Sequence, residues 1–135
     1  MGAIDVGMAL PAGRFEITRE TLIRYAGASG DFNVIHWNER VAKEVGLPDV
    51  IAHGMLTMGL AIRVVTDWLD DPAQLLEYGC RFTRPIVVPD DAEGAVLEVS
   101  GVVSAIDQGR ATVTLTARCN EVTVLGKATA IIRID

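Results

Sequence analysis

The first part of the chain carries apolar residues at helical spacing. One such pattern follows Thr18 and stops at Ser29-Gly30, which predicts a helix with Thr18 as its N-cap. Asn38 precedes a shorter pattern over residues 39–45, which ends at Gly46, a residue type that commonly closes helices. Two helices joined by a short loop are therefore expected here.

A third helix is predicted over residues 54–69. Apolar residues occupy nearly all of its sides, at Met55, Leu56, Met58, Leu60, Ile62, Val64 and Val65. A helix with so little polar surface belongs in the interior of a fold. Asp70-Asp71-Pro72 then ends it, because proline cannot continue a helix.

From Tyr78 onward the apolar spacing changes from helical to every second residue. Residues 111–117 alternate apolar residues with threonine, which is typical of a strand with one buried face. Further strands are predicted over residues 78–88, 95–106 and 122–134, and short connections would make neighbours antiparallel. The expected fold class is α+β, with a curved antiparallel sheet wrapped around the central apolar helix. One sheet covers one side of that helix, so we expect a second subunit to close the edge or the open face.

Length and composition indicate a single domain over residues 1–135. The longest apolar run, residues 51–65, is interrupted by His53, Thr57 and Arg63 and is too short to span a bilayer. No leader-type pattern opens the sequence, so we expect a soluble, cytoplasmic protein with no membrane partner.

Cysteine count and charge argue against a protein built on disulfides or a zinc knuckle and against a nucleic-acid-binding protein. Cys80 and Cys119 are too few and too far apart for a disulfide framework or a zinc knuckle, and we expect buried thiols. Twelve basic and eighteen acidic residues give a net charge of −6. Without a basic stretch to displace phosphate counterions, nucleic acid is not an expected partner.

Candidate chemistry begins at Asp31 and His36, which are five positions apart. On a regular helix these side chains would diverge by roughly 140°, so they can meet only if the backbone turns. Gly30 and Asn33 are residue types that favour such a turn. A carboxylate and an imidazole on one loop can transfer protons, although each residue taken alone is more often structural.

Gly54, at the start of the third helix, is a candidate oxyanion-binding residue. Its amide has no partner within the helix, and the helix dipole is positive there, so it can bind an oxygen that gains negative charge. The alternative is that Gly54 only allows close packing of the helix start. Its coexistence with the Asp31/His36 loop favours the functional interpretation.

Three stretches carry a family resemblance. They are YAGASGDFNVIH over residues 25–36, followed after five residues by Ala42, then IAHGMLTM over residues 51–58 and RFTRP over residues 81–85. They resemble the hydratase-2 signature, the central helix and the following strand of the MaoC-like dehydratases. Within that family the residues of these stretches most resemble those of the β subunit of the actinobacterial (3R)-hydroxyacyl-ACP dehydratase. Val34 stands where the family usually has proline.

The resemblance implies a hot-dog fold, a dimer, and reversible interconversion of a trans-2-enoyl thioester and its (R)-3-hydroxyacyl thioester, without metal or cofactor. In this interpretation His36 is the base in dehydration, Asp31 binds and protonates the leaving hydroxyl, and the Gly54 amide holds the enolate oxygen. Asn33 and Ser29 would orient the loop. The sequence leaves open which member of the pair handles which proton.

Neighbouring residues are expected to bind the substrate. The acyl part is assigned to Ile51, His53 and Met55. Coenzyme A and acyl carrier protein are anionic while this chain is net negative, so the carrier needs a local basic patch. Its candidates, which could equally be ordinary solvated charges, are Arg40, Lys43, Arg81 and Arg84.

Three alternatives remain beside this interpretation. A hot-dog thioesterase could use the same helix-start amide, and a non-catalytic acyl-binding subunit would keep the fold but lose the Asp31/His36 pair, which this chain has. A metal set of Asp31, His36 and His53 is disfavoured because no short-spaced ligand pair is present. The partner subunit could be identical or a related hot-dog subunit.

Overall fold

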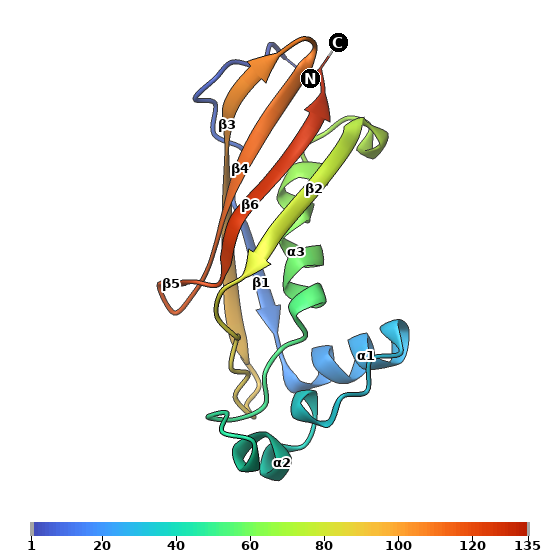
Figure 1. The fold of residues 1–135 in the computed structure, drawn as a ribbon, viewed down its shortest axis with the longest axis vertical. Coiled ribbons are helices and arrows are strands. Elements are labelled where there is room, and N and C mark those ends of the chain that lie inside the picture. Colours follow the sequence, from blue (N-terminus) through green and yellow to red (C-terminus); the bar gives the residue numbers. More distant parts are fainter. Residues whose placement is uncertain (1, 135) are drawn as a thin grey trace.

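A single antiparallel sheet curves around one helix, α3 (Gly54–Thr66), in a computed structural model that describes residues 2–134 (Figure 1). The strand order is β1-β3-β4-β6-β2, with a short β5 paired to β4. The strands are β1 (Gly13–Ile17), β2 (Leu75–Phe82), β3 (Ala95–Asp107), β4 (Arg110–Cys119), β5 (Val122–Thr123) and β6 (Leu125–Arg133). This confirms the predicted α+β class and the hot-dog arrangement of sheet and helix.

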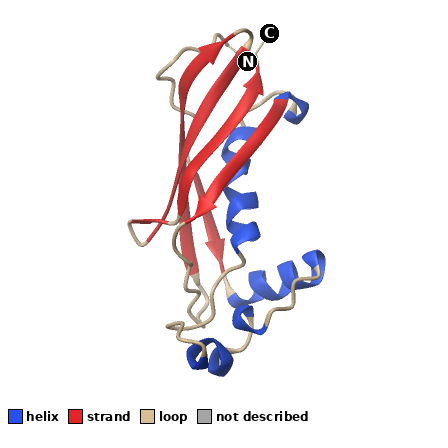
Figure 2. Cartoon of the chain, viewed as in Figure 1, coloured by secondary structure: helices blue, strands red, loops and turns tan. Residues whose placement is uncertain are grey.

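The two predicted front helices are present as α1 (Arg19–Ser29) and α2 (Glu39–Glu44). Both lie at one end of the sheet, next to the start of α3 (Figure 2). The Thr18 hydroxyl accepts from the Thr21 amide at the start of α1, and Gly30 ends it with φ 77°, a left-handed conformation that suits glycine. Helix α3 ends at Thr66, one turn earlier than predicted.

The expectation that strands next to each other in the sequence are antiparallel neighbours in the sheet is wrong for one pair of strands. β2 and β3 are not neighbours: β2 pairs with β6, while β3 pairs with β1 and β4. β2 also ends at Phe82, whereas a strand to residue 88 was expected. Pro85 has no amide proton, and the amides of Thr83 and Arg84 bond to the Val124 carbonyl, so the chain leaves the sheet here. This long connection lets β2 cross to the far edge.

The sequence analysis missed β1. It pairs with β3 from Gly13↔Val99 to Ile17↔Ala95. Its signal was the short alternation of Phe15 and Ile17 with charged residues, which five residues make easy to overlook. The predicted last strand is divided into β5 and β6 by Val124, whose amide bonds to the Ala117 carbonyl.

Helix α3 buries one side and leaves the other uncovered. Thr57, Ala61, Val64 and Val65 face the sheet, and the Tyr78 hydroxyl donates to the Met58 carbonyl at 2.8 Å, which ties β2 to the helix. Met55, Gly59 and Arg63 on the other side are exposed. Among residues 2–134, β2 has hydrogen-bonded pairing on its β6 side only, so the uncovered helix face and an open sheet edge both remain.

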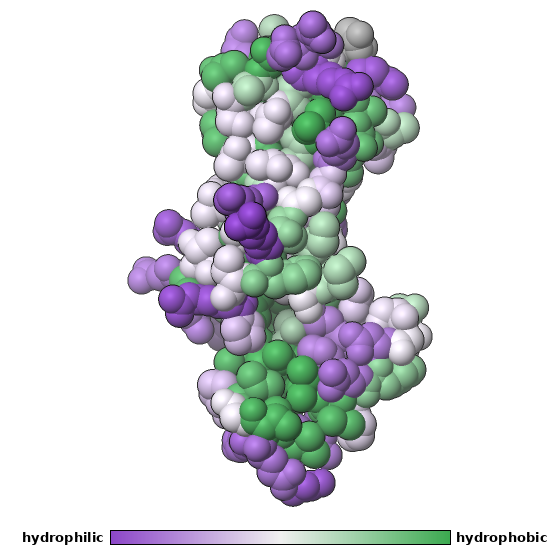
Figure 3. Space-filling model, in the orientation of Figure 1, coloured by the Kyte–Doolittle hydropathy of each residue, from purple (hydrophilic) through white to green (hydrophobic). Residues whose placement is uncertain are grey.

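Cys119 is buried and Cys80 half-buried, both as free thiols, and burial raises the pKa of each above its ordinary value. No helix in the described part of the chain is long and apolar enough to cross a membrane. In Figure 3 hydrophobic residues gather at the lower end of the visible face, over the part of the molecule that holds α2 and its neighbouring loops.

Candidate active site

The loop between α1 and α2 is built from side chains that bond to its own backbone. The Ser29 hydroxyl accepts from the Asp31 amide at 3.1 Å, and the Asp31 carboxylate accepts from the Asn33 amide at 3.1 Å. The Asn33 side chain accepts from the Ile35 amide and so begins a 3₁₀ turn over Val34–His36. These successive turns bring the chain round from Asp31 to His36, as the spacing of the two residues requires.

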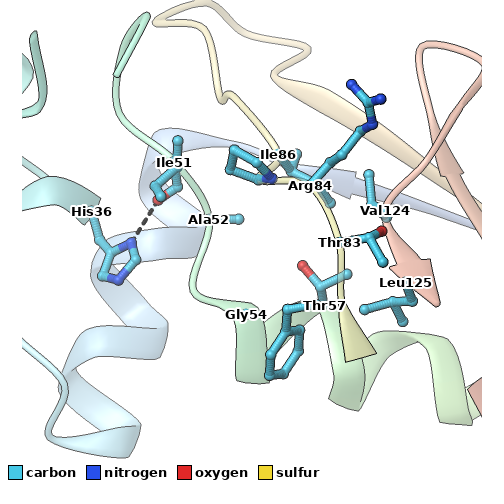
Figure 4. A pocket seen from close by; sticks show the side chains of 12 residues that line it. His36, Ile51, Ala52, Gly54, Thr57, Thr83, Arg84, Ile86, Val124 and Leu125 are labelled. Atoms are coloured by element: carbon cyan, nitrogen blue, oxygen red, sulfur yellow. Dashed lines mark hydrogen bonds between the residues drawn. The ribbon is translucent and has the colours of Figure 1, made fainter. Parts of the chain in front are cut away.

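His36 has one ring nitrogen engaged and one free. Its Nδ1 lies 2.7 Å from the carbonyl oxygen of Ile51 (Figure 4). A carbonyl oxygen only accepts, so Nδ1 carries the proton and Nε2 keeps an available lone pair. The ring is buried, with 7% of the residue exposed. His36 is therefore oriented as a proton acceptor.

Asp31, His36 and His53 form one cluster. A carboxylate oxygen of Asp31 and one nitrogen of each histidine all lie within 4.8 Å of one another. The two imidazoles stack with centroids 3.8 Å apart and an angle of 24° between their planes. Asp31 itself is exposed, so the carboxylate can meet a molecule that arrives from outside.

The cluster is poorly arranged for a metal ion. An imidazole binds metal along the lone pair in its ring plane. Because the His36 and His53 planes are stacked and nearly parallel, their lone pairs do not converge on one point. One nitrogen of each ring also bonds to a carbonyl oxygen. The arrangement favours proton transfer over metal binding.

A cavity of about 310 Å³ opens beside His36. Its wall is mostly apolar. It comes from His36 of the Asp31/His36 pair (the dyad), from the chain that leads into α3 and the start of α3, and from the segments that follow β2 and β5 (Figure 4). It is lined by His36, Ile51, Ala52, Gly54, Thr57, Phe82, Thr83, Arg84, Pro85, Ile86, Val124 and Leu125. A space of this kind suits the acyl end of a small apolar substrate.

Gly54 lies in the wall of this cavity, at the first position of α3. Among residues 2–134 no hydrogen bond to its amide is found, as expected for a helix start. A Cβ on Gly54 would lie 3.3 Å from the ring of Phe82, which is 54% exposed. The absence of a side chain thus keeps the approach to this amide open between the helix start and the end of β2.

Of the predicted substrate residues, the structure brings Ile51 and Arg84 to the cavity. His53 is buried behind it with 1% exposed, and Met55 points outward with 59% exposed. Arg40 and Lys43 lie on α2 and pair with Glu44 and Glu39, and Arg81 is exposed on β2. Substrate contacts by these five residues stay predictions, and the described residues do not place them in this cavity wall.

Arg19 fixes the segment that holds His36. Its Nε donates to the Val88 carbonyl at 2.7 Å, and its Nη2 donates to Asp49 at 3.0 Å. Burial alone would raise the pKa of Asp49, but the Val50 amide and the Arg19 charge hold it below its ordinary value. This ionised pair anchors the chain two residues before the Ile51 carbonyl.

Several cavity residues had no local signal in the sequence. Val124 and Leu125 reach the cavity only because β6 pairs with β2, a pairing that the sequence did not reveal. Phe82 and Thr83 were expected inside a longer strand. Thr57 could have been found, since it is a polar residue one turn after Gly54 on an otherwise apolar helix.

The sheet, helix and loop together define a hot-dog domain with an Asp–His pair at the edge of an apolar cavity. Residues 6–122 match the model of the MaoC-like domain, and the chain belongs to this family. A solved MaoC-like dehydratase superposes with a TM-score of 0.93 at 40% identity, over 98% of this chain and 41% of that one.

Two curated proteins of Mycobacterium tuberculosis are similar to this chain. One is 3-hydroxyacyl-thioester dehydratase X, 37% identical over 67% of this chain and 31% of its own length. The other is the 3-oxo-4,17-pregnadiene-20-carboxyl-CoA hydratase β subunit, 28% identical over 84% of each. The chain thus spans about a third of the first relative. A structure of the (R)-hydratase from A. caviae shares the fold, with a TM-score of 0.84 at 20% identity.

Proposed function

We propose that this chain is a catalytic subunit that interconverts trans-2-enoyl thioesters and (R)-3-hydroxyacyl thioesters. The observation that carries the proposal is the tautomer of His36. Its Nδ1 proton is committed to the Ile51 carbonyl, so in the neutral ring Nε2 is the nitrogen that can act as a base. His36 lines the apolar cavity, and one of its ring nitrogens lies within 4.8 Å of an Asp31 carboxylate oxygen. Membership of the MaoC-like domain family and the names of its relatives support the same reaction class.

In dehydration, a proton leaves the carbon next to the thioester carbonyl and the hydroxyl leaves the next carbon as water. His36 Nε2 takes the proton, and the negative charge that grows on the thioester oxygen is held by the Gly54 amide and the positive end of α3. Asp31, protonated at this point of the cycle, donates its proton to the hydroxyl, which leaves as water. The proton that His36 has taken then returns to the Asp31 carboxylate, so both groups regain their starting states. Both groups lie on one loop, so they act on the same face of the substrate, as syn elimination requires.

Asn33 and Ser29 support this chemistry by holding the loop. Their side chains bond to backbone amides of residues 35 and 31, so neither competes for the substrate. Arg84 is the one guanidinium among the cavity residues, and it supports recognition of the anionic carrier, either coenzyme A or acyl carrier protein.

The proposed partner is a second hot-dog subunit on the open edge of β2 and the uncovered face of α3. The name of one relative, a β subunit, and a solved ChsH1–ChsH2 complex at 25% identity support a heteromer as well as a homodimer.

A single assay separates the candidate activities. Purified protein is mixed with crotonyl-CoA, and enoyl absorbance and free thiol are followed together. Loss of enoyl absorbance without thiol release is expected, with (R)-3-hydroxybutyryl-CoA as the product by chiral chromatography. Thiol release would instead identify a thioesterase, and no reaction in a correctly assembled protein would identify a non-catalytic subunit.

A further inference from the structure

His53 is the most deeply buried polar residue of the described chain, and the reaction proposed above gives it no task. It is 1% exposed and does not line the cavity. Its Nε2 lies 3.0 Å from the backbone carbonyl oxygen of Asp31, 22 residues away. Because that oxygen only accepts, Nε2 carries a proton, and in the neutral ring Nδ1 then has none.

We propose that His53 is a positioning residue: a neutral imidazole, protonated on Nε2, that holds the Asp31/His36 loop in register with the Gly54 amide. The inference rests on the proposed function. It assigns to His53 a role behind the cavity, in place of the substrate contact expected from the sequence.

The unpaired nitrogen argues against simple space filling. Among residues 2–134, Nδ1 of His53 is the buried side-chain polar atom found without a hydrogen-bond partner. An apolar side chain of similar volume would fill the same space and leave no such atom. The Nε2 bond to Asp31 is the interaction that only a donor at this point can make.

His53 also limits the movement of His36. The two rings stack at 3.8 Å, and the edge of Tyr25 closes on His53 from α1 with centroids 4.8 Å apart. Together with the Ile51 carbonyl, this stack fixes the rotation of the His36 ring and the direction of its Nε2 lone pair.

The same residue is the start of α3. The carbonyl oxygen of His53 accepts from the amides of Leu56 and Thr57 at 3.1 and 3.2 Å, and Gly54 follows directly. Backbone and side chain of His53 therefore connect the oxyanion-binding amide to both members of the dyad. A displacement of about 1 Å in such a constellation can lower a rate about 100-fold.

The stacked arrangement requires a neutral His53. Burial lowers the pKa of His53 below its ordinary value, and the neighbouring His36 lowers it further. The hydrogen bond to the Asp31 carbonyl and the Asp31 carboxylate both raise this pKa, but burial has the largest effect. When His36 accepts the substrate proton, it then faces an uncharged ring rather than a second cation.

Two amide substitutions differ in where they place a hydrogen-bond donor. The glutamine amide nitrogen lies near the position of imidazole Nε2, and the asparagine amide nitrogen near that of Nδ1, so only His53→Gln restores a donor to the Asp31 carbonyl. With crotonyl-CoA, His53→Asn should lower kcat about 10- to 100-fold with KM changed less than about two-fold, and His53→Gln should recover most of the loss.

Equal losses in both variants, or a raised KM with kcat unchanged, would overturn the proposal. Wild-type protein gives a second test: nitrogen-15 NMR of the imidazoles should show His53 protonated on Nε2 alone at neutral pH. A proton on Nδ1 of His53 at that pH would overturn the proposal even if the variants fail to fold. An inactive wild-type enzyme would refute the proposed reaction, while the NMR measurement would still decide the state of His53.

Discussion

Two backbone carbonyl oxygens hold two neighbouring imidazoles of this protein in different tautomers. Ile51 fixes the proton of His36 on Nδ1 and Asp31 fixes that of His53 on Nε2, so one ring offers a lone pair to the cavity and the other a donor to the loop. Residue type alone cannot distinguish such roles, because the tautomer depends on the hydrogen bond at the opposite nitrogen.

The first prediction concerns the dyad. Asp31→Asn and His36→Ala should each lower kcat with crotonyl-CoA by about 10²- to 10⁴-fold, because each removes one proton-transfer group. Circular dichroism and thermal unfolding should show a folded protein in both cases, since Asp31 is exposed and His36 lies at the cavity wall. Near wild-type turnover in either variant would refute the mechanism.

The second prediction concerns carrier binding. Arg84→Ala should raise KM for an acyl-CoA more than it lowers kcat, and added salt should weaken binding by the wild type. Arg24→Ala is the matched control, because Arg24 is exposed, pairs with Glu20 on α1 and does not line the cavity. If both variants behave alike, Arg84 has no specific role in recognition.

The third prediction concerns stability and pH. Burial lowers the pKa of His53 in the folded state. In the unfolded chain the imidazole has its ordinary pKa of about 6.5, so as the pH falls the unfolded chain binds a proton at His53 before the folded chain does. The free energy of unfolding should therefore fall as the pH drops through that value. Urea titrations at several pH values should show this slope in wild type and a smaller one in His53→Gln; identical slopes would contradict it.

At the scale of elements, the ends of strands and helices build the site. The Asp–His loop follows α1, Gly54 begins α3, and the cavity wall comes from the chain that leaves β2 and enters β6. The regular parts of the helices and strands form the core, and their ends provide unpaired amides and side chains. Substitutions at the tight turns between these elements should therefore lower the free energy of unfolding.

The fourth prediction concerns one such corner. Gly94 has φ +69°, and a Cβ there would collide with the Ile17 carbonyl oxygen at the β1–β3 pairing. Gly94→Ala should lower the free energy of unfolding by about 1–3 kcal/mol. Gly27→Ala on the exposed side of α1, where nothing lies within 4 Å, should raise it by about 0.5–1 kcal/mol. Chemical denaturation of the two variants measures both, and equal effects would contradict the argument.

At the scale of the whole molecule, one subunit leaves its central helix half covered. The uncovered face of α3 lies next to the open edge of β2, and both are features that proteins normally protect. A second subunit placed there would bury the helix face and extend the sheet.

The fifth prediction tests this assembly. Light scattering should report a dimer or larger species, and Gly59→Glu should dissociate it, because Gly59 lies on the exposed face of α3 with nothing within 4 Å. The subunit itself should stay folded. Gly27→Glu on α1 is the control and should leave the mass unchanged. A stable, inactive wild-type monomer would instead point to a missing, different partner.

The sequence by itself determined the elements and the chemistry that depend on neighbours in the chain. The caps at Thr18 and Gly30, the turn from Asp31 to His36 and the alternation in β4 are local, because they follow from side-chain bonds and periodicity over a few residues. For the same reason the α+β class and the turn that brings Asp31 and His36 together could be predicted, while the catalytic role of the pair stays a prediction.

Only the tertiary structure decided what depends on distant pairing. β2 lies beside β6 rather than β3, and this brings Val124 and Leu125 to the cavity. The tautomers of His36 and His53 are set by carbonyls 15 and 22 residues away, and no local pattern announces such contacts. Hydrogen bonds between segments form only once the core has packed. The sequence therefore identified the candidate groups, and the fold determines which ring nitrogen of each histidine carries the proton.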